Sequence, residues 1–513
     1  MNERPLAPVA WSVLLGLTAV KLLLHALSSA WVAYGWVGDE LYFLDCARHL
    51  AWGYVDHPPF SIAVLRLWTE LLGESLLAVR LVPAFAGCAT IVLAGLMARE
   101  LGGGWVAQGL AGLGVLAGPV YLAMGGYYSM NPIDQTLWAV AAYLLLRLLN
   151  SESPRTWIAL GVVLGLGLLN KLSVVWLGCG ILAGILLTPQ RRWLATPWPW
   201  LAGAIAIAIV APYLLWQAQH GWPVLEFTRN ATLEKNVLAP PLVFLRLHVL
   251  AMHPLTLPFW LIGLIYLFFA PEARPYRTLG WVWLTVFLIL MASGTARTYY
   301  LAPPLTIAIA AAGRAVEGFG TRASMGWLPP AATTLLILAL VTGAPMSIPL
   351  LPPDRYVAYE RALGLKPPPE AREEPSELPL HFALRFHGPP LVRAVDAAYQ
   401  SLSPDDREHV VILTDSFHEA GAINVLGAAV GLPSAIGIHN NYWLWGAEDA
   451  TGDVFLVVAP MGSNLLALFR SVERAEEIDC GWCMPFLRKK AVYVCRDPRR
   501  PLRELWPELK KFI

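Results

Sequence analysis

Apolar segments about as long as a bilayer is thick recur along this sequence, and they constrain its fold more than any other feature. A helix needs about 20 apolar residues to cross the hydrocarbon core of a membrane. We expect about eleven spans, at 9–33, 78–98, 104–124, 132–149, 156–170, 172–188, 197–218, 243–269, 279–293, 298–316 and 326–346. The fold predicted for residues 1–348 is therefore a mostly α, polytopic membrane helical bundle.

Composition agrees with a membrane protein. The chain is 57% hydrophobic and 14% charged, whereas soluble domains carry roughly a quarter charged residues. Its formal net charge of +1 indicates neither nucleic acid nor an acidic partner. The start, "MNERPLAPV", lacks a short apolar core with a small-residue cleavage site. We expect the first span to be retained rather than removed as a signal peptide.

Basic residues predict which loops face the cytoplasm, because short cytoplasmic loops are rich in Lys and Arg. Alternate loops carry Arg4, Arg99, Arg147, "QRRW" at 190–193, "ARPYR" at 273–277 and Arg314. With the N-terminus cytoplasmic, the opposite side receives 34–77, 219–242 and everything after about residue 348. We therefore expect a multi-pass protein of the inner or plasma membrane with an extracytoplasmic C-terminal region.

The periodicity of the sequence changes after the last span. Residues 349–375 are rich in proline and are predicted to be a linker. Beyond it, 409–415, 453–460 and 491–496 are predicted strands, and 417–430 is a predicted helix. Alternating strands and helices predict a small, soluble α/β domain over 376–513.

The cysteines give a weaker signal. Cys480 and Cys483 form a single CxxC, and Cys495 follows nearby. One such pair is weak evidence for zinc. We favour a structural disulfide or free thiols over redox catalysis.

An unusually charged loop follows the first span, "GDELYFLDCARHLAWGYVDHPPF" at 38–60. Asp45, Arg48, His49 and Trp52 recur at i, i+3, i+4 and i+7, which predicts one polar face of a surface helix. "HPPF" predicts an extended turn before a second amphipathic helix at 60–72.

Asp39 lies where the first span should meet that surface helix. It could simply cap the helix, with Glu40 in the first turn favoured by the helix dipole. Capping and catalysis are compatible.

Near the same side of the membrane, ionisable residues interrupt several other predicted spans: Lys171, His253 and Arg297. Asp56 and His57 of the loop are expected on that side as well. Charges at such depth are costly and usually face a cavity or a partner. Lys171 and Arg297 could hold a lipid phosphate, although each taken alone could snorkel to the interface. A partly desolvated carboxylate there could act as a general base.

The motifs resemble those of the GT-C fold glycosyltransferases, which use lipid-linked sugars. The resemblance rests on "GDELYF…GYVDHPPF", "GLGLLNKLS", "ARTYYLAPPLTIAIAAAG" and, in the tail, "EAGAINVLGAAVGLPSAIGIHNNYWLWG". The group includes protein O-mannosyltransferases and the bacterial aminoarabinose transferase of lipid A. The resemblance spans most of the chain.

The resemblance implies roles for individual residues. Asp39 would be the base that takes a proton from the acceptor, with Glu40 and Tyr42 beside it. The other substrate-binding residues implied are Asp56, His57, Lys171, Arg297, Tyr299 and Tyr300. His57 departs from the Lys found there in many relatives. Asp56, His57 and His253 could instead ligate a divalent metal.

The sequence thus predicts an inverting glycosyltransferase in the membrane, with a polyprenyl-phosphate-linked sugar as donor. The acceptor would be a hydroxyl or amine of a lipid, protein or glycan. Adjacent Asp39 and Glu40 cannot flank a bond as the carboxylates of a glycosidase do. The alternative is a transporter or flippase of lipid-linked sugars, which should carry charges near the middle of the membrane and internal repeats.

Overall fold

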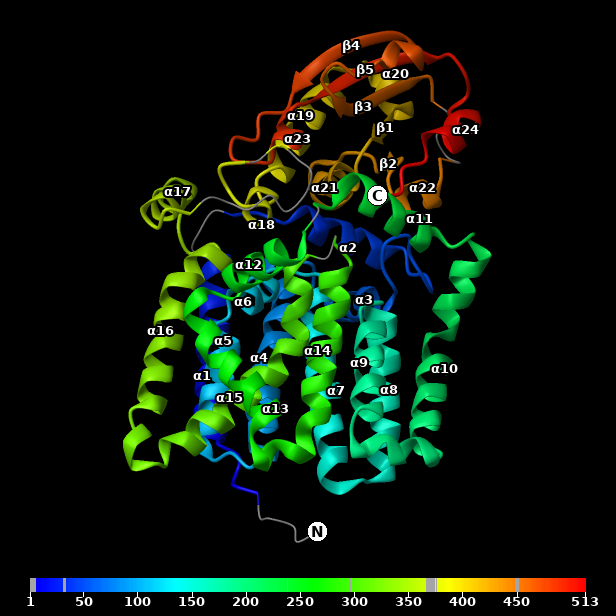
Figure 1. Ribbon diagram of the computed structural model, residues 1–513. Helices are drawn as coiled ribbons and strands as arrows, with labels where there is room; N and C mark the ends of the chain where they lie inside the picture. The colour runs from blue at the N-terminus through cyan, green and yellow to red at the C-terminus, as the bar shows by residue number, and fades with distance from the viewer. Residues whose placement is uncertain are drawn as a thin grey trace.

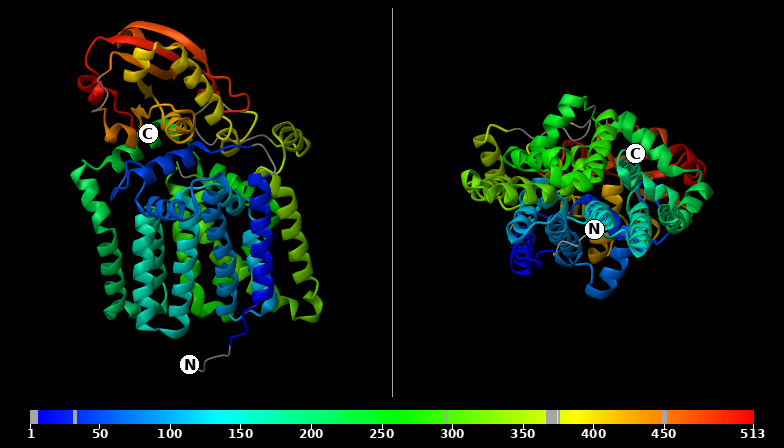
Figure 2. Two further views of the ribbon diagram at one scale, coloured as in Figure 1. Left: turned by 180° about the vertical axis from the view of Figure 1, so that it is seen from behind. Right: turned by 60° about the horizontal axis from the view of Figure 1, so that its bottom comes forward.

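Long helices stand side by side in a bundle, and a domain containing a sheet covers one end of it (Figure 1). This computed structural model describes residues 6–30, 34–237, 239–294, 297–365, 374, 376–447 and 452–513. We call 376–513 the outer domain, and the end of the bundle that it covers the outer end. Helix α1 begins at the opposite end, as Figure 2 shows from behind.

Each predicted span contains a helix. The helices of the bundle are α1 (Trp11–Ala30), α4 (Leu76–Glu100), α5 (Trp105–Ala117), α7 (Met130–Ser151), α8 (Pro154–Asn170), α9 (Val174–Leu186), α10 (Trp198–Gln219), α13 (Leu257–Phe269), α14 (Arg277–Ala292), α15 (Ala302–Gly320) and α16 (Leu328–Ser347). Short 3-10 helices lie beside them: η1 (Pro189–Ala195), η3 (Pro254–Thr256), η4 (Pro271–Tyr276), η5 (Thr298–Leu301) and η6 (Ala323–Met325).

The number of spans depends on how bent helices are counted. In the described residues, five helices are long and apolar enough to cross a membrane, or up to eight if each bent pair is one span. The count of eleven therefore stays a prediction. The segment expected as one span at 243–269 is broken by a 92° bend between α12 (Pro241–Ala251) and the helix that follows. The break is formed by His253 and Pro254. His253 has a φ of 70°, which is not helical, and Pro254 has no N–H to continue the hydrogen bonds of the preceding helix.

Short helices lie across the outer end: α2 (Gly38–Arg48), α3 (Phe60–Leu72), α6 (Pro119–Gly125), α11 (Pro223–Asn230), the π-helix η2 (Ala231–Lys235) and α12. Helix α3 has the predicted bounds. Helix α2 ends earlier than expected, so Trp52 lies beyond it and is 63% exposed. The hydroxyl of Tyr54 donates to the carbonyl of His49 and accepts from the N–H of Ala51, which folds this stretch into a loop.

The outer domain is the predicted α/β unit. Its strands are β1 (Val411–Thr414), β2 (Ala435–Gly437), β3 (Val454–Pro460), β4 (Phe469–Glu477) and β5 (Lys490–Pro498), in the order β2-β1-β3-β5-β4. The pairs β1–β2 and β1–β3 are parallel, whereas β3–β5 and β4–β5 are antiparallel. Helices around the sheet are α19 (Gly388–Ser401), α20 (Pro404–His409), α21 (Phe417–Leu426), α22 (Asn441–Trp445), α23 (Pro485–Arg488) and α24 (Leu502–Leu505), with the 3-10 turns η7 (Gly427–Val430), η8 (Leu465–Ala467) and η9 (Trp506–Leu509).

The region between the bundle and the sheet is partly helical. Helix α17 (Pro353–Ala362) lies within the predicted linker, whose residues 366–373 and 375 are outside the described residues. Helix α18 (Leu380–Ala383) follows, and Phe382 packs in the same apolar core as the bundle. Cys480 and Cys483 form a disulfide and belong to that core, while Cys495 is a buried free thiol. The outer domain is therefore held against the bundle by apolar packing.

Candidate functional site at the outer end

Asp39 and Glu40, two neighbouring carboxylates in the first turn of α2, lie in different environments. Glu40 is fully buried, and its carboxylate accepts two hydrogen bonds from Arg80, at 3.0 and 2.8 Å. It also accepts from the N–H groups of Val37 (2.9 Å) and Tyr128 (3.0 Å). Burial raises the pKa of Glu40, but the charge and hydrogen bonds of Arg80 outweigh it and hold this pKa below its usual value. Glu40 is thus an ionised anchor for the start of α2.

Asp39 has a different environment. It is half-buried, and in the described part of the chain its carboxylate accepts no hydrogen bond. Burial raises its pKa, the positive charges of Lys235 and Arg297 oppose that rise, and the charge of Asp56 adds to it. A carboxylate with a raised pKa beside two cations is suited to take up a proton and to act next to an anion.

Lys235 was not predicted from the sequence. It is the last residue of η2, in the outer segment 219–242, and it is half-buried. Burial and the nearby Arg297 lower its pKa, while Asp39 and Asp56 raise it. Lys235 therefore lies within electrostatic reach of both acids and of Arg297.

Asp56 and His57 are held by the loop that follows α2. The Asp56 carboxylate accepts hydrogen bonds from the hydroxyl of Tyr42 (2.8 Å) and the amide of Asn441 (3.3 Å). His57 is 1% exposed, its ring stacks on Phe43, and its Nε2 lies 3.8 Å from Asp56. Burial lowers the pKa of His57, which favours the neutral ring. His57 is therefore buried inside the loop, and its Nε2 has no hydrogen-bond partner among the described residues.

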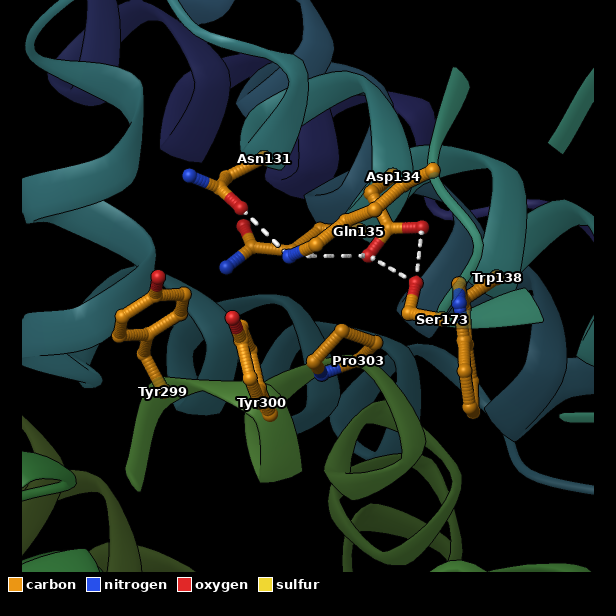
Figure 3. A pocket seen from close by; sticks show the side chains of 9 residues that line it. Asn131, Asp134, Gln135, Trp138, Ser173, Tyr299, Tyr300 and Pro303 are labelled. Carbon is orange, nitrogen blue, oxygen red and sulfur yellow. Dashed lines mark hydrogen bonds and ion pairs between the residues drawn. The ribbon is translucent and has the colours of Figure 1, made fainter. Parts of the chain in front are cut away.

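A small pocket is lined by residues of α7, of the turn between α8 and α9, of η5 and of α15 (Figure 3). Helix α8 ends at Asn170, so the extended Lys171 begins the turn to the next helix. Its Nζ donates to Asn131 Oδ1 (2.7 Å), is 4.0 Å from Asp134, and lies over the ring of Tyr300 at 4.4 Å. The hydroxyl of Ser173 donates to both oxygens of Asp134, at 2.9 and 3.0 Å.

The segment around η5 joins the pocket to the charges near Asp39. Tyr299 and Tyr300 line the pocket from the side opposite to Asn131 (Figure 3). Arg297 directly precedes η5, and its charge acts on Asp39 and on Tyr300. The structure therefore brings Asp39, Lys171, Arg297 and the two tyrosines to one end of the bundle.

Four polar residues of the pocket were missed from the sequence: Asn131, Asp134, Gln135 and Ser173. Asp134 is the clearest, because a buried carboxylate in the apolar stretch 132–149 is a signal that the sequence carries. Its position near the start of a predicted span made it look like an ordinary helix end.

The outer domain packs directly on α2. Asp45 accepts hydrogen bonds from the hydroxyl of Tyr442 (2.6 Å) and the amide of Asn424 (2.8 Å). The ring of His49 stacks on Trp445 at 4.2 Å. Asp45 and His49, on the face of α2 predicted to be polar, thus contact α21 and α22, whereas Trp52 of the same predicted face is exposed beyond the helix end.

Residues of the tail motif "GIHNNYWLWG" contact other parts of the outer domain and the loop after α2. His439 Nε2 bonds the carbonyl of Ile513 at 2.8 Å, and the indole of Trp443 donates to the carbonyl of Trp506 at 2.8 Å. Asn441 contacts the loop near Asp56 through its amide. The motif therefore holds the C-terminal residues and joins the outer domain to the loop.

Of the three possible metal ligands, Asp56 and His57 lie 3.8 Å apart. In the residues that the structure describes, no group of three or more His, Cys, Asp or Glu side chains could hold a metal. His253 lies at the bend before α13, where its Nε2 bonds the hydroxyl of Thr342 at 3.0 Å. The suggestion that Asp56, His57 and His253 hold a metal gains no support from the described residues and stays a prediction.

The arrangement of helices and outer domain is the GT-C fold of membrane glycosyltransferases, which confirms the resemblance found in the sequence. The crystal structure of ArnT from Cupriavidus metallidurans bound to undecaprenyl phosphate aligns with a TM-score of 0.63. The alignment covers 94% of this chain and 98% of the ArnT chain, at 16% sequence identity. The apo structure of the same protein gives 0.61.

Comparison of sequences finds a matching family and relatives whose names describe sugar transferases. The sequence model of the family described as dolichyl-phosphate-mannose-protein mannosyltransferase matches residues 56–216. The undecaprenyl phosphate-alpha-4-amino-4-deoxy-L-arabinose arabinosyl transferase of Pseudomonas aeruginosa is 27% identical over 205 residues, which is 35% of each chain. Lipid A galacturonosyltransferase RgtD of Rhizobium johnstonii is 26% identical over 194 residues, or 37% of this chain and 40% of the relative. The chain thus matches little more than a third of the length of these curated relatives.

Proposed function

We propose that this protein is an integral membrane glycosyltransferase that moves a sugar from a polyprenyl-phosphate donor to an acceptor hydroxyl or amine. The observation that carries the proposal is the position of Asp39, a half-buried carboxylate with a raised pKa, within reach of Lys235 and Arg297. This group lies between the end of the helical bundle and the outer domain, where a membrane lipid could present its head group. The GT-C fold and the relatives support the same reaction class.

In the proposed reaction, Asp39 accepts the proton of the acceptor O–H or N–H as that atom attacks the anomeric carbon. The bond from the anomeric carbon to the phosphate oxygen breaks, and polyprenyl phosphate leaves with the electron pair. Because phosphate is a good leaving group, no general acid is needed. A single displacement of this kind inverts the anomeric centre.

In this proposal the cations bind the phosphate of the donor. Lys171 and Arg297 bind the donor phosphate, with Lys235 as an additional cation near Asp39, and stabilise the charge that develops on the leaving oxygen. Tyr299 and Tyr300 line the donor pocket, and Tyr42 positions Asp56 through its hydroxyl. Glu40 is assigned a positioning role, since Arg80 and two backbone N–H groups occupy its carboxylate.

Acceptor and topology complete the proposal. The outer domain, 376–513, is placed on the extracytoplasmic side of the inner or plasma membrane, and the acceptor is a lipid, protein or glycan of that side. The single base at Asp39 distinguishes this site from that of a hydrolase, where two carboxylates flank the bond.

The experiment compares lipids and glycans of cells that make the wild-type protein, Asp39→Asn or no protein, by mass spectrometry. We expect a sugar-sized mass increase on one acceptor class only with wild type. Asp39→Asn and the cells without the protein should give the same profile. A lipid-linked sugar that changes sides of the membrane without any transfer would indicate a transporter instead.

A further inference from the structure

Two adjacent asparagines of the outer domain, Asn440 and Asn441, have no role in the proposed reaction. They are 0% and 1% exposed, and they form the start of α22. Asn440 has a φ of 49° and a ψ of −125°, a conformation that favours glycine. A strained backbone of this kind persists only where the surrounding structure requires it, and such residues gather at functional sites.

The side chain of Asn440 binds the segment 511–513. Its Oδ1 accepts the N–H of Ile513 at 3.1 Å, and its Nδ2 donates to the carbonyl of Ile513 at 3.4 Å. The N–H of Asn440 donates to the carbonyl of Lys511 at 2.9 Å. Glycine would adopt this backbone more easily but could not make the two side-chain bonds. The asparagine is therefore explained by the segment that it holds.

That segment in turn binds the helix that leads to Lys235. The carbonyl of Phe512 accepts a hydrogen bond from Nδ2 of Asn230 at 2.8 Å. Asn230 is the last residue of α11, and η2 follows it directly and ends at Lys235. The π-helical turn of η2 is a rare conformation that occurs mostly at functional sites. Contacts thus run without a gap from Asn440 through Phe512 and Ile513 to the turn that carries Lys235.

Asn441 holds the loop that carries Asp56. Its Oδ1 accepts the N–H of Val55 at 2.9 Å. Its Nδ2 donates to the carboxylate of Asp56 at 3.3 Å and to the hydroxyl of Tyr42. One side chain of the outer domain therefore fixes both the backbone of this loop and its carboxylate.

The two charges held in this way act on Asp39 in opposite directions. Burial raises the pKa of Asp39, the charges of Lys235 and Arg297 lower it, and the charges of Asp56 and Glu40 raise it. Glu40 is fixed by Arg80 of the bundle. Lys235 and Asp56 are the members of this group that the outer domain reaches through its asparagines.

Two histidines and a tyrosine complete the titratable groups that face Lys235, and they are His418, His439 and Tyr300. Burial lowers the pKa of His418, and it lowers that of His439 to about 3, so both rings are neutral. The charges near Asp39 are therefore those of Lys235, Arg297, Asp56 and Glu40.

We propose that Asn440 and Asn441 are positioning residues of the transfer reaction, and that they hold Lys235 and Asp56, respectively, near Asp39. This inference rests on the proposed function, because it assigns the contacts to the base of that reaction. The outer domain then takes part in catalysis through the placement of two opposite charges.

The test is the pH dependence of kcat/KM of the full-length protein, for the transfer that mass spectrometry of the cells identifies. Asn440→Gly relaxes the backbone but releases 511–513, so Lys235 is held less firmly and the acid limb should move to higher pH. Asn441→Ala releases Asp56, so the limb should move to lower pH. We expect shifts of about half a pH unit. With Lys235→Met already present, Asn440→Gly should add no further shift, since both changes act through one charge.

Asn464→Gly, at an exposed asparagine of the same domain, is the matched control and should leave the limb unmoved. A measurement that needs no transfer is the distance between spin labels at Glu234→Cys on η2 and Arg191→Cys in η1, with the exposed Cys179 changed to Ser. We expect a narrow distribution of distances in this protein. The distribution should broaden with Asn440→Gly but not with Asn464→Gly.

The outcomes separate this proposal from the function on which it rests. If Lys235→Met and Asp56→Asn leave the acid limb unmoved, the base assigned under the proposed function is wrong. If they move it and the two asparagine variants do not, or if both asparagine variants move it in the same direction, the positioning proposal alone is overturned. An unchanged distance distribution in Asn440→Gly, or a lower rate at every pH without a shift, would overturn it as well.

Discussion

Asp39 and Glu40 show how two adjacent carboxylates of one helical turn acquire different chemistry. Glu40 points into the bundle, where Arg80 and two backbone N–H groups satisfy it. Asp39 points to the cations at the outer end and keeps a raised pKa. The first carboxylate can fix the helix while the second reacts, because each environment favours a different protonation behaviour.

Glu40→Gln tests the anchoring role. Removing one partner of a buried ion pair leaves an uncompensated charge on Arg80, so we expect a loss of about 3–5 kcal/mol of stability together with loss of transfer. Glu70→Gln removes an exposed pair with Arg66 and should cost less than about 1 kcal/mol. Thermal denaturation of both variants gives the comparison. Equal stability of the two would contradict the anchoring role.

The pH dependence of transfer tests the environment of Asp39. A base must be ionised, so kcat/KM should fall as acidification protonates Asp39. Lys235→Met removes a charge that lowers the pKa of Asp39, so the acid limb should move to higher pH. Asp56→Asn removes a charge that raises it, so the limb should move to lower pH, each by about one pH unit.

The control for this pair is Lys489→Met, which changes an exposed lysine of the outer domain and should leave the profile unmoved. Shifts of the two variants in the same direction would show that the acid limb does not report Asp39.

At the level of elements, α2 is positioned by contacts from both domains. Arg80 of α4 holds its start, and Tyr442 of α22 holds Asp45 in its middle. The C-terminal end of α2 was not predicted from the sequence. The helix ends at Arg48, where the hydroxyl of Tyr54 bonds the backbone of the residues that follow, and the periodicity of the sequence does not indicate such a contact. Helix α3 was predicted with its bounds, since its pattern of apolar residues is local.

Tyr442→Phe tests the contact between the domains. The hydroxyl donates to a buried carboxylate at 2.6 Å, and hydrogen bonds to charged groups contribute about 1.5–3 kcal/mol. We expect a loss of stability in that range and a lower rate of transfer. Tyr493→Phe, whose hydroxyl makes no hydrogen bond within the described residues, should be near neutral. The two are compared by thermal denaturation, and equal effects would argue against the contact.

For the whole molecule, the sequence predicted the helical bundle, the α/β domain and the grouping of Asp39, Lys171 and Arg297 at one end. These predictions follow from the lengths of the apolar segments and from the end of the span at which each charged residue lies. Lys235 was missed because a lysine in a polar segment is unremarkable until the fold brings it to Asp39. The contacts of Asn424 and Asn441 with the loop join residues more than 370 positions apart, which no local pattern can indicate.

Topology is the prediction that belongs to this scale. Glu476→Cys on β4 should react with a membrane-impermeant maleimide in cells whose outer envelope is opened. Arg191→Cys in η1, at the opposite end of the bundle, should react only after the membrane itself is permeabilised. The reverse pattern would place the outer domain in the cytoplasm and exclude the proposed acceptors.

The central claim is that Asp39 is the base of a sugar transfer. Its most direct test is the rate of transfer from a polyprenyl-phosphate sugar by Asp39→Asn, measured alongside the binding of undecaprenyl phosphate, with Asp405→Asn in the outer domain as the control. General bases contribute about 10²–10⁴-fold, so we predict a loss of that size with phosphate binding retained. Near-normal transfer by Asp39→Asn would contradict the account.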